Sequence, residues 1–298
     1  MLHKLKTEGN KIVNELGEEV ILKGININSP CILKYQENHD FLNDIREIKK
    51  LGTNAVRIPI CPAYWQSVEN YCEEILNPIV QLSKELDLYC CLDWHAQGNP
   101  FKNETREPNQ LIEGYMKYDA KKELAFEVLE KISKLYGKEN HIIFDVFGMP
   151  IDIENKDWIN ITQKFVDVVR KNTENIIVVN GTNWSSDLSW VFIDPIKSKN
   201  IVYGICYYPL EKTQDISVVI KVKEIYPIIF SECGYTIDGY FKGTKEDYAA
   251  KLKKYVSEYG FGFFAWCYHP KRVPVILNSW DPNDLTEWGR FLKEELLK

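Results

Sequence analysis

Four polar side chains of different chemistry lie at the ends of short apolar runs. Arg57 lies in NAVRIPI, His95 ends LYCCLDWH, Tyr208 ends ICYY and Glu232 lies in PIIFSECG. A guanidinium, an imidazole, a phenol and a carboxylate at such positions carry an electrostatic cost, which chains usually tolerate where the groups bind or react with something. Because a lone buried carboxylate is costly without partners, we interpret Glu232 as held in a ligand-binding geometry, with the capping of a buried network as the alternative. Arg57 fits either a structural ion-pair partner or, together with Glu232 and Tyr208 on facing strands, a site residue.

These residues sit on alternating β-rich and helical segments. Apolar runs predict strands at residues 24–27, 55–58, 89–94, 142–147, 176–180, 202–207, 228–231 and 263–267, mostly separated by helical spacing of apolar residues. Residues 11–22 predict a β-hairpin that turns near Gly17. Eight βα units fit one (β/α)8 barrel, so we predict an α/β fold in which residues 1–298 form a single TIM barrel domain with an N-terminal β-hairpin.

In that fold the strands end at one rim, where the chemistry occurs, so the other strand ends supply further candidates. They are Gly148 and Met149, Trp184, Cys206 and Trp266. Trp266 is interpreted as a platform for a sugar ring, because aromatic faces stack on pyranose rings. Trp184 fits either a platform or a core position. His95 fits a ligand contact and a packed, hydrogen-bonded histidine equally well.

The motifs KGININ, NAVRIPI, LDWH, NGTNW, PIIFSECG and LTEWGRF resemble, in order and spacing, those of glycoside hydrolase family 5, the cellulase-like barrels. The resemblance covers nearly the whole chain. It implies that Glu232 stands at the position of the nucleophile, with Arg57 and Tyr208 supporting its charge. It also implies that His95 and Trp266 contact the substrate, a β-linked oligosaccharide or polysaccharide.

The chain departs from this family in the same region. Where the family has Asn-Glu-Pro, this sequence has Gly148, Met149 and Pro150. By the resemblance, Gly148 replaces the amide that holds the sugar 2-hydroxyl, and Met149 replaces the acid/base glutamate. Cys206 replaces a histidine two residues before Tyr208. A thioether has no proton to give to a leaving alcohol.

Three functions remain open. A retaining glycosidase needs two carboxyl groups about 5 Å apart, so the loss of one predicts a carbohydrate-binding protein with lost or altered hydrolysis, a degenerate enzyme. The alternative is an active retaining hydrolase or transglycosylase with a relocated acid, for which Asp152, Glu154 and His269 are candidates. Asp152 and Glu154 also fit solvated charges near a helix start, which is the simpler interpretation. A further alternative is a protein-interaction barrel with a vestigial site.

Composition restricts the partners. A net charge of −6 argues against nucleic acid and anionic membrane surfaces, and no apolar run approaches the roughly 20 residues of a membrane span. The N-terminal residues lack the apolar run of a signal peptide, so we expect a cytoplasmic protein unless a leader has been removed. Eight cysteines without a C-x-x-C pair predict buried thiols, and no ligand spacing supports a metal or another cofactor.

Overall fold

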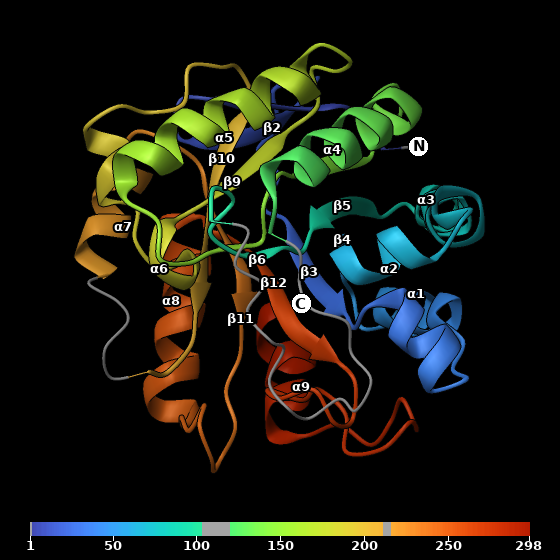
Figure 1. Cartoon of the computed structure of the whole chain (residues 1–298). Coiled ribbons are helices and arrows are strands. Elements are labelled where there is room, and N and C mark those ends of the chain that lie inside the picture. Colours follow the sequence, from blue (N-terminus) through green and yellow to red (C-terminus); the bar gives the residue numbers. More distant parts are fainter. Residues whose placement is uncertain (1, 103–119, 211–215) are drawn as a thin grey trace.

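The computed structural model describes residues 2–102, 120–210 and 216–298, and its centre is a closed barrel of parallel strands (Figure 1). The strands lie in the order β10, β11, β12, β3, β4, β5, β7 and β9 around the barrel. Their bounds are β3 Lys23–Ile27, β4 Ala55–Ile60, β5 Tyr89–Trp94, β7 Ile142–Asp145, β9 Ile177–Asn180, β10 Ile201–Tyr207, β11 Ile228–Cys233 and β12 Gly262–Tyr268. The predicted (β/α)8 barrel is therefore confirmed, and both ends of each strand lie within two residues of the predicted ends.

Helices surround this barrel (Figure 1). In the first of them, the carboxylate of Asp40 accepts hydrogen bonds from the backbone N–H groups of the first turn, which fixes where the helix begins. The α-helices are α1 Phe41–Lys50, α2 Pro62–Ser67, α3 Asn77–Glu85, α4 Lys122–Tyr136, α5 Asn155–Arg170, α6 Thr182–Ser185, α7 Ile216–Lys223, α8 Ala250–Tyr259 and α9 Glu287–Phe291. Shorter helical turns cover Ile32–Gln36, Cys72–Leu76, Ser189–Phe192, Lys245–Ala249 and Leu292–Leu296.

The N-terminal hairpin pairs β1 Leu5–Glu8 with β2 Lys11–Asn14 and is antiparallel, as predicted. Its turn lies at Gly9, where φ is +58°, and not at Gly17. The chain does turn again at Gly17, with φ of +82°, but there it forms only a single antiparallel bridge. Both glycines can adopt the left-handed backbone conformation that such turns need, so the sequence alone did not show which of them forms the hairpin turn. The apolar side chains of the hairpin pack against the first residues of the barrel strands and close that end.

The chain leaves the barrel earlier than predicted after β7, which ends at Asp145. The backbone N–H groups of Gly148 and Met149 donate to the carbonyl oxygens of Trp94 and Ala96, at 2.8 and 3.0 Å. As a result, β8 Met149–Pro150 pairs with β6 Gln97–Gly98 in a separate two-stranded parallel sheet at the rim. This small sheet determines the position of Met149.

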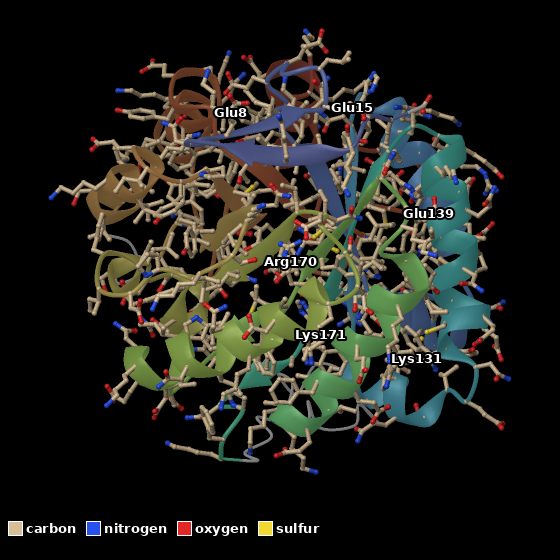
Figure 2. All side chains as sticks on the ribbon, turned by 90° about the horizontal axis from the view of Figure 1, so that it is seen from above. Glu8, Glu15, Lys131, Glu139, Arg170 and Lys171 are labelled. Carbon is tan, nitrogen blue, oxygen red and sulfur yellow. The ribbon has the colours of Figure 1, made fainter. Side chains whose placement is uncertain are left out.

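Charged side chains such as Glu8 and Glu15 on the hairpin and Lys131 and Lys171 near α4 and α5 lie exposed on the outside (Figure 2). All eight cysteines are buried thiols, and none of them forms a disulfide. Over the described residues, we find no helix with the length and apolar character that crossing a membrane requires.

Candidate active site

Arg57, on β4, is the charged centre of the barrel and is fully buried. Its Nη2 lies 2.9 Å from Oδ2 of Asp145 and 3.1 Å from Oδ2 of Asp93, and its Nη1 donates to Oδ1 of Asn26 at 3.0 Å. Burial lowers the pKa of Arg57, but Asp93, Asp145 and Glu232 raise it more, so the net pKa lies well above the ordinary value. One permanent cation thus compensates several buried acids.

Glu232, on β11, receives one donor on each carboxylate oxygen. Nη1 of Arg57 lies 3.1 Å from Oε1, and the hydroxyl of Tyr208 donates to Oε2 at 2.9 Å. Burial and the Glu232 charge raise the pKa of Tyr208 well above its usual range, so this phenol remains a donor. The two donors stabilise the negative charge and fix the direction in which Glu232 points.

Asp93 and His95 form a second buried pair next to this carboxylate. Nδ1 of His95 lies 2.6 Å from Oδ2 of Asp93. Burial lowers the pKa of His95, but the charge and the hydrogen bond of Asp93 outweigh burial and raise it above its ordinary value. The ring of His95 is stacked nearly parallel to that of Trp266, with centroids 6.0 Å apart.

Asp145 and Asn180 complete the polar centre. The amide of Asn180 donates to Oδ1 of Asp145 at 2.7 Å, and its oxygen accepts from the hydroxyl of Ser231 at 2.8 Å. Burial raises the pKa of Asp145 to about 6, although the Arg57 guanidinium opposes this rise. The contacts form a continuous network from β3 to β11 across the barrel interior.

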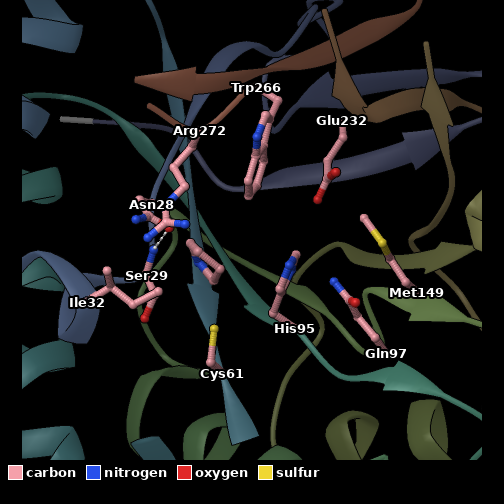
Figure 3. Close-up of a pocket in the computed structure, with 11 residues that line it drawn as sticks. Asn28, Ser29, Ile32, Cys61, His95, Gln97, Met149, Glu232, Trp266 and Arg272 are labelled. Carbon is pink, nitrogen blue, oxygen red and sulfur yellow. Dashed lines mark hydrogen bonds between the residues drawn. The ribbon is translucent and has the colours of Figure 1, made fainter. Parts of the chain in front are cut away.

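A cavity of about 140 Å³ opens at the C-terminal ends of the strands. Its lining comprises Asn28, Ser29, Ile32, Pro59, Cys61, His95, Gln97, Met149, Glu232, Trp266 and Arg272. Figure 3 shows Met149 extending into it from β8 toward the carboxylate of Glu232. Among the described residues that line the cavity, Glu232 is the only one with a carboxylate side chain.

The three candidates for a relocated acid do not line this cavity. His269 is fully buried, its Nε2 lies 2.8 Å from Glu37, and its Nδ1 accepts from the backbone N–H of Lys271 at 2.8 Å. Asp152 is exposed, and Glu154 is the residue immediately before α5.

The predicted site residues divide into four groups. His95, Met149, Glu232 and Trp266 line the cavity. Arg57 and Tyr208 act behind Glu232, and Gly148 and Cys206 are buried beside the site without lining the cavity. Trp184 lies apart from the lining on α6, with 42% of its surface exposed.

Sequence reasoning missed two classes of residue. The network residues Asn26, Asp93, Asp145 and Asn180 carry a usable signal, because each is a polar side chain inside an otherwise apolar strand. The lining residues Asn28, Ser29, Gln97, Cys61 and Arg272 lie in loops or at strand ends and carry no comparable signal. Among the described residues, no group of three His, Cys, Asp or Glu side chains could hold a metal ion.

The sequence model of the family described as Cellulase (glycosyl hydrolase family 5) matches residues 13–272. The chain belongs to glycoside hydrolase family 5. The match includes all the strands of the barrel and the residues that surround Glu232.

Individual relatives of this family 5 chain are distant. An endoglucanase of Clostridium saccharobutylicum is 22% identical over 98% of this chain and 65% of its own length. A beta-mannanase/endoglucanase A of Caldicellulosiruptor saccharolyticus is 27% identical over 84% of this chain and 19% of its own length. The chain thus spans less than two thirds of either curated relative.

Solved structures share the fold. The beta-glucanase SdGluc5_26A of Saccharophagus degradans, in complex with cellotetraose, superposes with a TM-score of 0.85 at 23% identity, over 98% of this chain and 92% of that one. The catalytic domain of the endoglucanase Cel5A of Thermobifida fusca gives a TM-score of 0.81 at 16% identity, over 99% and 97% of the two chains. At these identities the likeness concerns the barrel.

Proposed function

We propose that this family 5 chain binds β-linked oligosaccharides in the cavity at the barrel rim, and that its hydrolytic reaction is lost or strongly weakened. One observation carries the proposal: Glu232 is positioned by two donors, while the described cavity lining holds Met149 and no second carboxyl group. Retaining hydrolysis by this family's mechanism requires a pair of carboxyl groups about 5 Å apart.

Glu232 retains what a nucleophile needs. Arg57 and Tyr208 bind and orient its carboxylate, which places it to attack an anomeric carbon in the cavity. The missing part is the proton for the departing oxygen, which would otherwise leave as an alkoxide. General acid catalysis contributes roughly 100- to 10,000-fold, or about 3–5 kcal/mol of barrier, so its loss suffices to suppress turnover of ordinary glycosides.

The ligand class rests on the cavity wall and on the relatives. Trp266 and His95 present parallel rings at the rim, a surface suited to a sugar face with its hydroxyl edge. The beta-glucanase with the same fold is known in complex with cellotetraose, which supports a β-linked glucan as the first ligand to test.

A relocated acid is the less supported alternative. Asp152 and Glu154 lie outside the cavity lining, and His269 is occupied by Glu37 and by the backbone of Lys271. Protonating Nδ1 of His269 would replace an acceptor with a second donor facing the Lys271 N–H, which the geometry disfavours.

The test uses an aryl β-glucoside whose activated leaving group departs without a proton donor. We expect a burst of released phenol, equal to the enzyme concentration, followed by faster turnover and a glycosyl azide product when azide is added. Glu232→Gln, which keeps the size and removes the nucleophile, should abolish both. Fast hydrolysis of plain cello-oligosaccharides by the unaltered protein would contradict a lost acid. Absence of both a burst and measurable binding of cellotetraose would favour the interaction barrel instead.

A further inference from the structure

Three hydrogen-bond donors gather at one end of the cavity without an acceptor among the residues that the structure describes. Nδ2 of Asn28, Oγ of Ser29 and Nε of Arg272 are buried atoms, and none has a hydrogen-bond partner in the described parts of the chain. All three residues line the cavity. Figure 3 shows them together on the side away from Met149 and Gln97. Leaving a buried donor unpaired costs about 1–3 kcal/mol, so three at one place indicate a missing acceptor.

The orientation of the Asn28 amide is determined by its neighbour. Oδ1 of Asn28 accepts from the backbone N–H of Ser29 at 2.9 Å, so the opposite atom is the NH₂ group. Asn28 is 5% exposed and Ser29 is 1% exposed. Both side chains are therefore buried, and neither donor atom contacts bulk water.

Arg272 adds a positive charge that its nearest carboxylate only partly satisfies. Nη2 of Arg272 lies 3.6 Å from Oε1 of Glu37, beyond an ordinary hydrogen bond. The other oxygen of Glu37 is already 2.8 Å from Nε2 of His269. The guanidinium is thus near a carboxylate but does not use its Nε–H there, and that N–H remains available to a planar acceptor.

We propose that Asn28, Ser29 and Arg272 form a subsite for an anionic oxygen group, a carboxylate or a sulfate, carried by the bound oligosaccharide. A guanidinium and an amide NH₂ only donate, so they match a group that only accepts. A neutral sugar hydroxyl could give its hydrogen to Oγ of Ser29, but it would bring no negative charge to the Arg272 guanidinium, which Glu37 only partly balances. The inference rests on the proposed function, because the anion is placed on a glycan.

The experiment compares three oligosaccharides of equal length by calorimetry: cellotetraose, its analogue with one glucuronic acid unit, and its analogue with one 6-sulfate. We expect the carboxylated ligand to bind at least tenfold more tightly than cellotetraose, a preference that shrinks as salt is raised. Arg272→Gln and Ser29→Ala should reduce that preference to about twofold or less. Lys271→Gln removes the same charge one residue away, outside the lining, and should leave the preference intact.

Ser29→Ala also separates binding from folding. Since Oγ of Ser29 makes no hydrogen bond in the described structure, its removal should leave the urea midpoint unchanged or raise it while weakening the carboxylated ligand. A fall in the midpoint would show that Oγ has a structural partner and would count against the inference.

The remaining outcomes are distinct. Tighter binding of the sulfated ligand alone would support the subsite and identify sulfate as the anionic group that it binds. Equal binding of all three ligands would overturn the subsite and leave the proposed function standing. If no oligosaccharide binds, the proposed function fails, and the subsite is decided by thermal shift with acetate and sulfate. A shift that Arg272→Gln abolishes would retain the subsite, and no shift would overturn it.

Discussion

Nη1 of Arg57 lies 3.1 Å from Oε1 of Glu232, and this contact joins the candidate nucleophile to the buried charges of the barrel. The same guanidinium binds Asp145 and Asn26, so one side chain supports both the site and the fold. A change at Arg57 should therefore affect stability as well as chemistry, and the two effects need separate measurements.

Replacing Arg57 with methionine should lower the free energy of unfolding by about 3–5 kcal/mol at pH 7. The apolar side chain preserves length but leaves Asp93, Asp145 and Glu232 buried without their shared cation. Urea unfolding followed by circular dichroism measures the loss. Arg46→Met is the matched control, because Arg46 is exposed, and it should stay within about 0.5 kcal/mol of the wild type. An Arg57 variant as stable as that control would show that the carboxylates are not held as ions.

Met149→Glu should raise the hydrolysis of plain cello-oligosaccharides by about 100-fold or more, because it places a proton donor beside the leaving oxygen. Met149 already extends into the cavity on the Glu232 side, so the new carboxyl group enters from the same backbone position (Figure 3). Met149→Gln has nearly the same shape without an acidic proton and should give no gain. Reducing-sugar release under matched conditions compares the three proteins. Equal activity in the glutamate and glutamine variants would argue that a missing acid is not the limiting defect.

Gly204→Ala should destabilise the barrel by about 1–3 kcal/mol, since an added Cβ would lie 2.3 Å from Oδ1 of Asn180. Asn180 is fixed by Asp145 and Ser231 and cannot move away cheaply. Gly148→Ala is the graded comparison, because its Cβ would lie 3.1 Å from Asp93, and it should cost less than about 1 kcal/mol. Thermal unfolding ranks the two variants, and the reverse order would contradict this packing.

His269 should make the fold sensitive to acid. Burial lowers its pKa to about 4, even though Glu37 favours the charged ring, while in the unfolded chain the pKa is about 6.5. Below pH 6.5 the His269 ring is protonated in the unfolded state, whereas in the folded state it stays neutral until the pH falls to about 4. The stability contributed by the neutral ring is thus fully present above pH 6.5 and is lost as the pH falls toward 4.

His269→Gln should remove this sensitivity. Between pH 7 and pH 5, the wild type should lose about 2 kcal/mol more unfolding free energy than the variant. Asp44, whose pKa burial raises to about 6, acts with the opposite sign over part of this range, so only the difference between the two proteins isolates His269. Urea titrations at both pH values supply that difference, and parallel losses would show that His269 titrates normally.

The barrel and the ends of its strands were accessible from the sequence because apolar runs and helical spacing are local patterns. The same patterns placed Glu232 and Arg57 on strands β11 and β4, and their contact at 3.1 Å crosses the interior of the closed barrel, into which both side chains point. The turn of the hairpin was not determined, since Gly9 and Gly17 carry equal local signals.

The sequence by itself determined the barrel, the family and the residue types at its rim, above all a methionine where a proton donor is expected. Tertiary structure decided which groups share the cavity. Trp184 lies apart from it, whereas Asn28 and Arg272, near opposite ends of the chain, meet because β12 pairs with β3 to close the barrel. That closure depends on the packing of the whole sheet, and no short stretch of sequence encodes it.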